Sequence, residues 1–325
     1  MYPIKLKPIL KQHIWGGEAL LHIKKGQGLR VDKTKVYGES WDVSGIEKNI
    51  SVISNGFLKG NNLQEAIEVY MGELVGDSVF EQYGLDFPLL LKTLHCKDRT
   101  SVQVHPDDDL AAERHQSCGK TEMWYILDAE PDAVLYIGFK NPEITREQYI
   151  DAIAKGTIAD IIEPVNIKAG DAFLIPSGTV HSISGGVTLI EIQQPVDLTY
   201  RIFDWNRVDA NGKSRELHTA YAVDATDFSS TAAQCRRDYN IEVNKSVEVA
   251  SCDYFTCNIL KVQECLEHNI SSIDSFVLYY CTEGRVEITN DDGTETLKAG
   301  EILLISADTN ELSIKGNATL LEYYI

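Results

Sequence analysis

The chain has 325 residues, of which 43% are hydrophobic and 24% charged, a composition typical of a soluble globular protein with enough apolar material for a sizeable core. Its formal net charge of −19 argues against nucleic acid and anionic membrane surfaces as partners, because both are also negatively charged. A phosphate-bearing ligand would need a local cluster of basic groups to overcome this overall field.

The cysteine pattern and the termini bear on the compartment. The seven cysteines are scattered and form no Cys-x-x-Cys pair, which indicates free thiols in a reducing environment rather than a disulfide framework. The N-terminus lacks the apolar core and cleavage site of a secretory signal, and no stretch approaches the ~18 apolar residues of a membrane span. We expect a cytoplasmic protein, a monomer or small homo-oligomer, that binds neither nucleic acid nor membrane.

The first periodic segment along the chain is helical. Apolar residues from Leu63 to Leu74 fall on one helical face, and Asn62 with Glu65 matches a capping box. Strands are predicted next at residues 101–105, 123–127 and 133–138, and the last two flank turn residues and resemble a hairpin. Thr145 with Gln148 predicts a second short helix. Both helices are expected to act as packing supports.

Short apolar runs continue to the C-terminus, at residues 172–175, 187–192, 275–281, 285–289 and 302–305. Many short strands separated by turn residues favour an all-β barrel or sandwich. Residues 167–176 (IKAGDAFLIP) and 297–306 (LKAGEILLIS) form an internal repeat, which predicts two copies of one barrel. We therefore expect a mainly β protein with two β-barrels and a few short helices. Residues 1–228 would form a metal-binding catalytic domain and residues 229–325 a degenerate second barrel.

The strand Ser101–His105 carries the first part of a metal site. Alternate strand residues share one face, so Ser101, Gln103 and His105 lie on one side and Val102 and Val104 on the other. A Ser/Gln/His row facing inward is unusual for a plain core and natural for a site. Pro106 favours an extended conformation at His105 and ends the strand.

A second motif supplies another imidazole. The segment Gly170-x5-Pro176-x-Gly178-x2-His181 predicts a tight turn followed by a strand that begins at His181, and it resembles the second cupin motif. In the first cupin motif, usually His-x-His followed by Glu, Gln103 takes the place of the first His, His105 is the second and Glu122 is the acid. These four groups suit one divalent ion such as zinc, manganese, iron or cobalt. The amide would be a weaker donor than a third imidazole and leave the ion more electrophilic.

The second repeat lacks these ligands. No histidine follows Ile305, and Glu311 stands at the position that corresponds to His181. The C-terminal copy is therefore expected to be metal-free and structural.

Several further motifs carry a specific resemblance. They are Trp15-Gly16-Gly17, residues 37–41 (YGESW), 101–106 (SVQVHP), 119–122 (GKTE) and 193–205 (QQPVDLTYRIFDW). Together they resemble type I mannose-6-phosphate isomerase in its compact bacterial form, a member of the cupin superfamily. The resemblance implies the interconversion of mannose 6-phosphate and fructose 6-phosphate with one bound zinc. It implies metal ligands at Gln103, His105, Glu122 and His181, an active-site arginine at Arg201, and substrate contacts at Lys92, Ser101 and Lys120.

Two departures limit what the resemblance transfers. The interval from Tyr136 to Gly170 is too short for the helical domain that longer members insert there. Longer members also place an aromatic residue two positions after the last His ligand, where this chain has Ile183. An aromatic contact to the sugar is therefore not carried over. Trp15 either lines the mouth of the site or packs between the barrels, and Glu39 and Trp41 are expected near the site.

Aldose–ketose isomerisation passes through an enediolate, which sets the chemistry required. A Lewis-acidic ion orients oxygens at C1 and C2, and Arg201 can stabilise the developing negative charge. The proton-transfer group stays open among Glu191, Lys120, Asp204 and a metal-bound water. For the phosphate, Arg99 is a further nearby cation. Two alternatives remain: another metal-dependent cupin enzyme such as an oxygenase, and a non-catalytic metal- and sugar-binding cupin.

Overall fold

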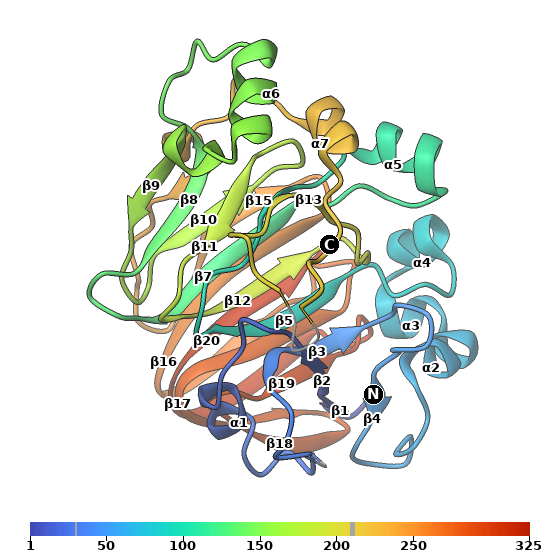
Figure 1. Ribbon diagram of the computed structural model, residues 1–325. Helices are drawn as coiled ribbons and strands as arrows, with labels where there is room; N and C mark the ends of the chain where they lie inside the picture. The colour runs from blue at the N-terminus through green and yellow to red at the C-terminus, as the bar shows by residue number, and fades with distance from the viewer. Residues whose placement is uncertain (30, 209–211) are drawn as a thin grey trace.

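Three antiparallel sheets form the framework of the structure, a computed structural model that describes residues 1–29, 31–208 and 212–325 (Figure 1). The first sheet has seven strands, in the spatial order β14 (Arg236–Arg237), β10 (Ala172–Ile175), β7 (Glu122–Ala129), β12 (Val187–Gln193), β5 (Leu90–Cys96), β3 (Tyr37–Ser44) and β2 (Ile9–Gln12). The second has five strands, β13 (Tyr200–Phe203), β6 (Val102–Val104), β11 (His181–Ile183), β8 (Val134–Phe139) and β9 (Ile162–Asn166).

The third sheet has eight strands and takes most of them from the C-terminal third of the chain. Its spatial order is β15 (Ser246–Cys252), β16 (Phe255–Asn269), β20 (Glu311–Tyr324), β17 (Val277–Asn290), β19 (Ile302–Ile305), β1 (Ile4–Lys7) and β4 (Val52–Ile53), and β18 (Gly293–Lys298) pairs with β17. The N-terminal strand β1 thus pairs with β19, and the chain's first residues belong to the same sheet as its last. The expected division between residues 228 and 229 remains a prediction.

Helices are short and lie outside the sheets. In Figure 1, α5 to α7 gather at one end of the molecule and α2 to α4 lie along one side. The helices are α1 (Ala19–Ile23), α2 (Leu63–Tyr70), α3 (Gly72–Val75), α4 (Asp77–Tyr83), α5 (Asp108–His115), α6 (Arg146–Lys155), the 3-10 turn Ile158–Asp160, α7 (Thr219–Ala225) and α8 (Ala232–Cys235). Within the described ranges, none of them has the length and apolar character that crossing a membrane requires.

Both predicted helices are confirmed, together with their capping boxes. Asn62 and Glu65 cap α2 reciprocally, and Thr145 and Gln148 do the same for α6. The first helical segment is interrupted at Met71, which has a φ of 48°, so that α3 begins as a separate turn. The buried face of α2 packs into a core shared with the seven- and eight-stranded sheets. The helices therefore act as packing supports.

One predicted strand pairing is wrong. Residues 123–127 and 133–138 do form strands, within β7 and β8, but the two strands lie in different sheets and form no hairpin. β7 pairs with β10 and β12, whereas β8 pairs with β11 and β9. The turn residues between them carry the chain from one sheet to the other, a choice that local turn chemistry does not specify.

The internal repeat folds into the same structure twice. In the first copy Gly170 has a φ of 88°, and Lys168 N–H donates to the Asp171 carboxylate at 3.2 Å. In the second copy Gly300 has a φ of 83°, and Lys298 N–H donates to Glu301 at the same distance. Each turn leads into a fully buried four-residue strand, β10 or β19. The positive φ explains the shared glycine, and the matching turns support a duplicated β unit.

The architecture is mainly β with a few short helices, as predicted. Among the described strands no sheet closes into a continuous hydrogen-bonded barrel. A buried cluster that includes Trp124, Phe173 and Leu135 draws residues from both the seven- and five-stranded sheets. Val102 and Val104 belong to a separate cluster with Tyr149 of α6 and Ala222 of α7. The two faces of β6 therefore differ as the alternation predicted, and the Gln103 face remains for a site.

Candidate metal centre and active site

Strand register brings three of the predicted site residues into one row. In the five-stranded sheet β6 lies between β11 and β13, and Gln103 is the direct partner of His181 on one side and of Arg201 on the other. Gly178, with a φ of 85°, donates its N–H to the carbonyl of His105 at 2.8 Å. This turn fixes the start of β11 next to the end of β6, so the separated motifs meet.

His105, Glu122 and His181 converge on a common point. Their candidate ligand atoms all lie within 4.8 Å of one another, and all three side chains are buried. His105 Nε2 lies 3.5 Å from Glu122 Oε2, and His181 Nε2 lies 3.4 Å from Glu122 Oε1. Glu122 comes from β7 of the seven-stranded sheet, so the cluster bridges the two sheets. These separations leave room for one ion among two imidazoles and a carboxylate.

The hydrogen bonds of the two imidazoles prepare them for metal binding. His105 Nδ1 lies 2.9 Å from the carbonyl of Leu198, and His181 Nδ1 lies 2.9 Å from the carbonyl of Thr179. A carbonyl only accepts, so each Nδ1 carries the proton and each Nε2 keeps its lone pair. Histidine ligands of metals are commonly oriented in this way.

Three buried acceptor atoms in the cluster lack a hydrogen-bond partner among the described residues: His105 Nε2 and both oxygens of Glu122. Lys120 Nζ lies 2.9 Å from Glu122 Oε2 as an ion pair without hydrogen-bond geometry. Unpaired buried acceptors are costly, and a divalent cation would satisfy all three. This chemistry fits the predicted metal.

Burial shifts the protonation of the cluster. It lowers the pKa of His181 to about 4 and, with the charge of Lys120, holds the pKa of His105 well below its usual range. Burial and the charge of Glu191 raise the pKa of Glu122 to about 7. Both imidazoles are therefore neutral at pH 7, the form that binds metals.

Gln103 lies next to this cluster. Its Nε2 is 3.1 Å from His181 Nε2, and its Oε1 accepts a hydrogen bond from Ser101 at 3.3 Å. The amide thus donates to the lone pair of His181. A half-turn about its terminal bond would direct the oxygen to the same point, as a fourth ligand requires.

A cavity of about 300 Å³ opens beside the cluster. The sequence-predicted substrate contacts Lys92, Ser101 and Lys120 all line it, together with Gln103 and Arg201. Its walls contain four cationic side chains and three carboxylates, so the cavity is far less acidic than the whole chain. The complete lining is His13, Trp15, Glu39, Lys92, Leu94, Thr100, Ser101, Gln103, Lys120, Ile183, Glu191, Asp197, Thr199, Arg201 and Arg215.

The two lysines are paired with carboxylates. Lys92 Nζ donates to Glu191 Oε1 at 2.8 Å and to Gln193 Oε1 at 2.7 Å, and Lys120 Nζ lies 3.8 Å from Glu191 Oε1. Burial opposes the charge on Lys92, but Glu191 and Glu39 outweigh it and raise its pKa. Burial would raise the pKa of Glu191, but the two lysines lower it. Lys92 is therefore a fixed cation at the cavity wall.

Among the four cations that line the cavity, Arg201 lacks a carboxylate partner in the described part of the chain. It forms no ion pair with any carboxylate of the described residues; its Nη1 donates to the carbonyl of Glu216 at 2.8 Å. Its buried Nε has no partner there either. Burial and the neighbouring Arg215 lower its pKa, but a guanidinium remains protonated in proteins. The cavity therefore holds a positive charge that an anion would balance.

Arg99 and Asp204, which the sequence suggested as a phosphate contact and a proton-transfer group, do not line this cavity. Arg99 places its guanidinium over the Trp205 ring, 4.5 Å from the centroid, and is exposed. Asp204 is engaged by Arg207 and Arg215. Neither reaches the cavity, because each side chain is committed to the loop that follows β13.

Glu39 and Trp41 were expected near the site, and Trp15 either at its mouth or packed between the barrels. Trp15 lines the cavity, belongs to the buried core between the two sheets and stacks on His13. Glu39 also lines the cavity and accepts a hydrogen bond from the buried Trp41 at 2.8 Å. Trp15 therefore lies at the cavity, as the first of its two alternatives predicted, and the described cluster that contains it includes no residue of the eight-stranded sheet.

Sequence reasoning missed Arg215, His13, Asp197 and Thr199 as lining residues. Asp197 and Thr199 belong to the 193–205 motif. Because this motif is long, it could have been expected to contribute several residues to the cavity lining. Arg215 reaches the cavity from the long segment after β13, and no periodic pattern marks it. His13 precedes the Trp15 motif and gave no separate signal.

Two family models match the chain. Residues 4–135 match the catalytic domain of type I phosphomannose isomerase, and residues 245–325 match the cupin domain of mannose-6-phosphate isomerase. The matches flank the segment that carries His181 and Arg201.

Similar proteins cover nearly the whole chain. The mannose-6-phosphate isomerase ManA of Bacillus subtilis is 32% identical over 97% of this chain and 96% of its own length. A mannose-6-phosphate isomerase of Streptococcus mutans is 34% identical over 78% of this chain and 77% of its own. The crystal structure of the mannose 6-phosphate isomerase from Bacillus subtilis superposes with a TM-score of 0.88 at 32% identity and covers 100% of both chains.

Proposed function

This chain belongs to the family of type I mannose-6-phosphate isomerases, so we propose that the cavity beside His105, Glu122 and His181 is where it interconverts mannose 6-phosphate and fructose 6-phosphate. It is an aldose–ketose isomerase. The observation that carries the assignment of the site is the set of buried acceptors without hydrogen bonds on His105 and Glu122, next to a cavity lined by Arg201, which forms no ion pair among the described residues.

We propose one divalent ion at the convergence point, held by Gln103, His105, Glu122 and His181. Zinc suits this mixed imidazole and carboxylate set. When bound, the ion supplies Lewis acidity that polarises and orients the oxygens at C1 and C2 of the sugar. The neutral amide of Gln103 adds no charge to the site, so less of the ion's charge is cancelled by its ligands.

Side chains of the cavity would bind the substrate and stabilise the charge that develops during the reaction. Lys92, Ser101 and Lys120 bind and orient the substrate, and Arg201 stabilises the charge that develops on the enediolate oxygen. Lys92 is held in place by Glu191 and Gln193, so it can act as a preorganised donor rather than a mobile one.

The proton must move between C1 and C2, and the geometry narrows the choice of protein group. Asp204 is excluded because two arginines hold its carboxylate outside the cavity lining. Lys120 and Glu191 both line the cavity and can both hold a proton. Glu191 is a weaker base than an ordinary glutamate, because the two lysines stabilise its ionised form and lower its pKa.

The phosphate would lie toward Arg215, whose guanidinium lines the cavity, and Arg201 would remain for the enediolate oxygen. Arg215 donates through Nε and Nη2 to Asp204. A planar guanidinium has five donors, so Arg215 can bind a phosphate oxygen while it keeps this carboxylate.

The proposal extends to the domain organisation, the compartment and the oligomeric state. We propose that the sheets form two cupin barrels, with residues 1–228 as the catalytic domain and residues 229–325 as the degenerate one. The matching turns at Gly170 and Gly300 support this duplication. A cytoplasmic enzyme that acts on a small sugar phosphate, as a monomer or small homo-oligomer without nucleic acid or membrane, agrees with its acidic composition.

A coupled assay tests the proposal. Purified chain loaded with zinc should form fructose 6-phosphate from mannose 6-phosphate, lose this turnover on chelation and regain it when zinc is restored. Folded, metal-loaded protein without chelator-sensitive turnover would instead indicate a non-catalytic sugar-binding cupin. Oxygen consumption with redox-active iron would indicate a cupin oxygenase.

A further inference from the structure

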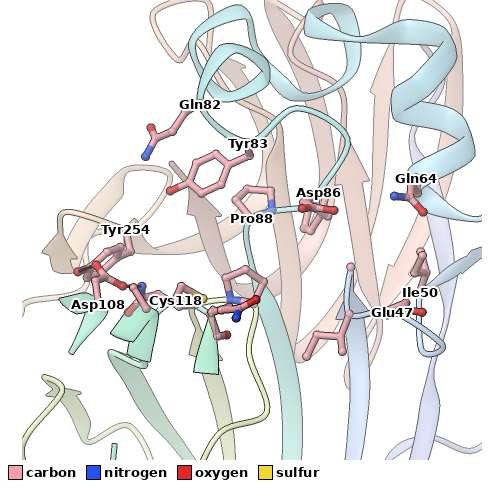
Figure 2. A pocket seen from close by; sticks show the side chains of 18 residues that line it. Glu47, Ile50, Gln64, Gln82, Tyr83, Asp86, Pro88, Asp108, Cys118 and Tyr254 are labelled. Atoms are coloured by element: carbon pink, nitrogen blue, oxygen red, sulfur yellow. Dashed lines mark hydrogen bonds between the residues drawn. The ribbon is translucent and has the colours of Figure 1, made fainter. Parts of the chain in front are cut away.

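A second and larger cavity, of about 790 Å³, is lined by Asp108, Cys118 and Tyr254 among other residues (Figure 2). It shares no lining residue with the cavity beside the metal cluster. Two chain segments separate them: Cys118 and Gln194 face the large cavity, whereas Lys120 and Asp197 face the smaller one. Groups on the large-cavity side can therefore act on catalytic residues without contacting substrate.

Asp108 lies on the large-cavity side of these two segments and accepts hydrogen bonds from three parts of the chain. Its Oδ1 accepts a hydrogen bond from Gly119 N–H at 2.7 Å and from Gln194 Nε2 at 2.9 Å. Its Oδ2 accepts a third from the Tyr254 hydroxyl at 2.6 Å. Charge-assisted hydrogen bonds of this kind are stronger and more directional than neutral ones. One carboxylate thus ties together three separate segments of the chain.

Gln194 extends the connection to the catalytic strand. Its Oε1 accepts a hydrogen bond from Thr121 N–H at 2.8 Å, while its own backbone N–H donates to the carbonyl of Thr121 at 3.3 Å. Asp108 therefore fixes the backbone on both sides of Lys120, directly through Gly119 and indirectly through Thr121. Glu122 is the next residue along.

Close packing at Gly119 makes this arrangement specific. A Cβ at this position would lie 2.6 Å from the backbone of both Asp107 and Asp108, so only glycine lets the segment approach the start of α5. Lys120 N–H also donates to the carbonyl of Pro106 at 3.1 Å. The segment that carries Lys120 is thus held rigidly against the first turn of α5.

Tyr254 brings the C-terminal sheet into the network. It lies in the turn between β15 and β16, 146 residues from Asp108 in the chain. Figure 2 shows it beside Asp108 at one end of the large cavity. Burial, and then the hydrogen bond to Asp108, raise the pKa of Tyr254, so its hydroxyl remains a donor.

We propose that Asp108 is a positioning residue that fixes Lys120 and Glu122 from the side of the large cavity, and that Tyr254 of the C-terminal sheet holds Asp108 in place. The proposal rests on the function proposed above for the cavity. It gives the C-terminal sheet a role in catalysis, because the β15–β16 turn sets the geometry of a strand in the seven-stranded sheet.

The experiment compares Asp108→Ala with Asp109→Ala, a neighbouring exposed acid in the same first turn of α5. Because a displacement near 1 Å can cost on the order of 100-fold in rate, Asp108→Ala should lower kcat by about 10–100-fold. It should also weaken zinc affinity, measured by chelator competition, while Asp109→Ala changes neither. Asp108→Asn keeps the acceptor for Gly119 and Gln194 and should restore most of the activity.

Tyr254→Phe removes only the hydroxyl that donates to Asp108, so it tests the same contact if Asp108→Ala fails to fold. Its loss should be smaller, about 3–10-fold, and it should add nothing in an Asp108→Ala background, because coupled residues are not additive. Unchanged kcat and zinc affinity in Tyr254→Phe and Asp108→Ala would overturn the inference, and so would fully additive effects. A wild-type chain inactive on mannose 6-phosphate would count against the proposed function alone, and zinc affinity would still decide the positioning role.

Discussion

Lys24 and Asp42 form an ion pair of 2.7 Å in which each side chain is only 1% exposed. Lys24 follows α1, Asp42 lies in β3 of the seven-stranded sheet, and Lys24 Nζ also donates to the carbonyl of Gly300 in the repeat turn before β19 at 2.8 Å. Asp42 further accepts hydrogen bonds from Ser40 and Thr93. This cluster joins the seven-stranded sheet to the C-terminal sheet through fully satisfied polar contacts.

Breaking this pair should destabilise the protein strongly. Lys24→Ala leaves the carboxylate of Asp42 buried without its countercharge, which typically costs about 3–5 kcal/mol in the free energy of unfolding. Lys25→Ala removes an exposed lysine from the next position and should change stability by less than about 0.5 kcal/mol. Urea unfolding of both variants measures the difference. Equal stability of the two variants would show that the pair does not hold the sheets together.

Loss of one imidazole should remove the metal and the activity together. His181→Ala deletes a buried ligand atom from a cluster whose members lie within 4.8 Å of each other. Metal content, determined by mass spectrometry after dialysis, should fall from about one ion per chain to near zero, and turnover should fall with it. His95→Ala serves as the control, because His95 is half-buried and hydrogen-bonded to Thr188 outside the cluster. A His181→Ala protein that retains stoichiometric zinc would exclude His181 as a ligand.

Arg201→Ala should separate chemistry from metal binding. The guanidinium lines the cavity but is not part of the metal cluster, so zinc content should be unchanged. Removing a preorganised charge that stabilises a developing oxyanion commonly costs about 10²–10³-fold in kcat. Steady-state kinetics at saturating substrate measures this loss. A variant with normal kcat and raised KM would assign Arg201 to uniform binding of the phosphate instead.

The sequence could bring His105 and His181 together because its signals for them are local. Alternation along residues 101–105 placed Gln103 and His105 on one face, and the Gly/Pro/Gly turn placed His181 at the start of the next strand. The capping boxes and the repeat turns are local too, and the structure contains them. Side-chain chemistry at fixed short spacings is what such patterns encode.

The sequence could not predict which distant strands and residues contact one another, for a physical reason. The turn after β7 was recognised, but whether the chain then stays in its sheet depends on which surfaces pack together, not on the turn. The Asp108–Tyr254 contact joins residues 146 positions apart, and Arg215 enters the cavity from an irregular segment. Neither carries a periodic pattern, so only the folded chain reveals them.

Glu322 gives the C-terminal sheet an acid-sensitive anchor. Its carboxylate is buried and accepts hydrogen bonds from Tyr279 at 2.7 Å, Asn258 at 3.0 Å and Ser246, and it pairs with His268 at 2.7 Å. Burial alone would raise the pKa of Glu322, but His268 and these donors outweigh it and lower the pKa to about 2. Because the folded-state pKa lies below the ordinary value of 4.5, the ionised form stabilises the fold.

The stabilisation from Glu322 should be complete above pH 5 and should disappear as the pH falls from about 4.5 to about 2. The pKa difference corresponds to about 3 kcal/mol as an order of magnitude. Glu322→Gln should therefore be less stable than the wild type at pH 7, and the gap should close toward pH 2.5. Urea unfolding across this range measures the gap. Glu248→Gln on strand β15 of the same sheet is an exposed control that should follow the wild type at every pH. A gap that stayed constant from pH 7 to pH 2.5 would show that Glu322 contributes through packing rather than through its charge, because only ionisation links its stabilising effect to pH.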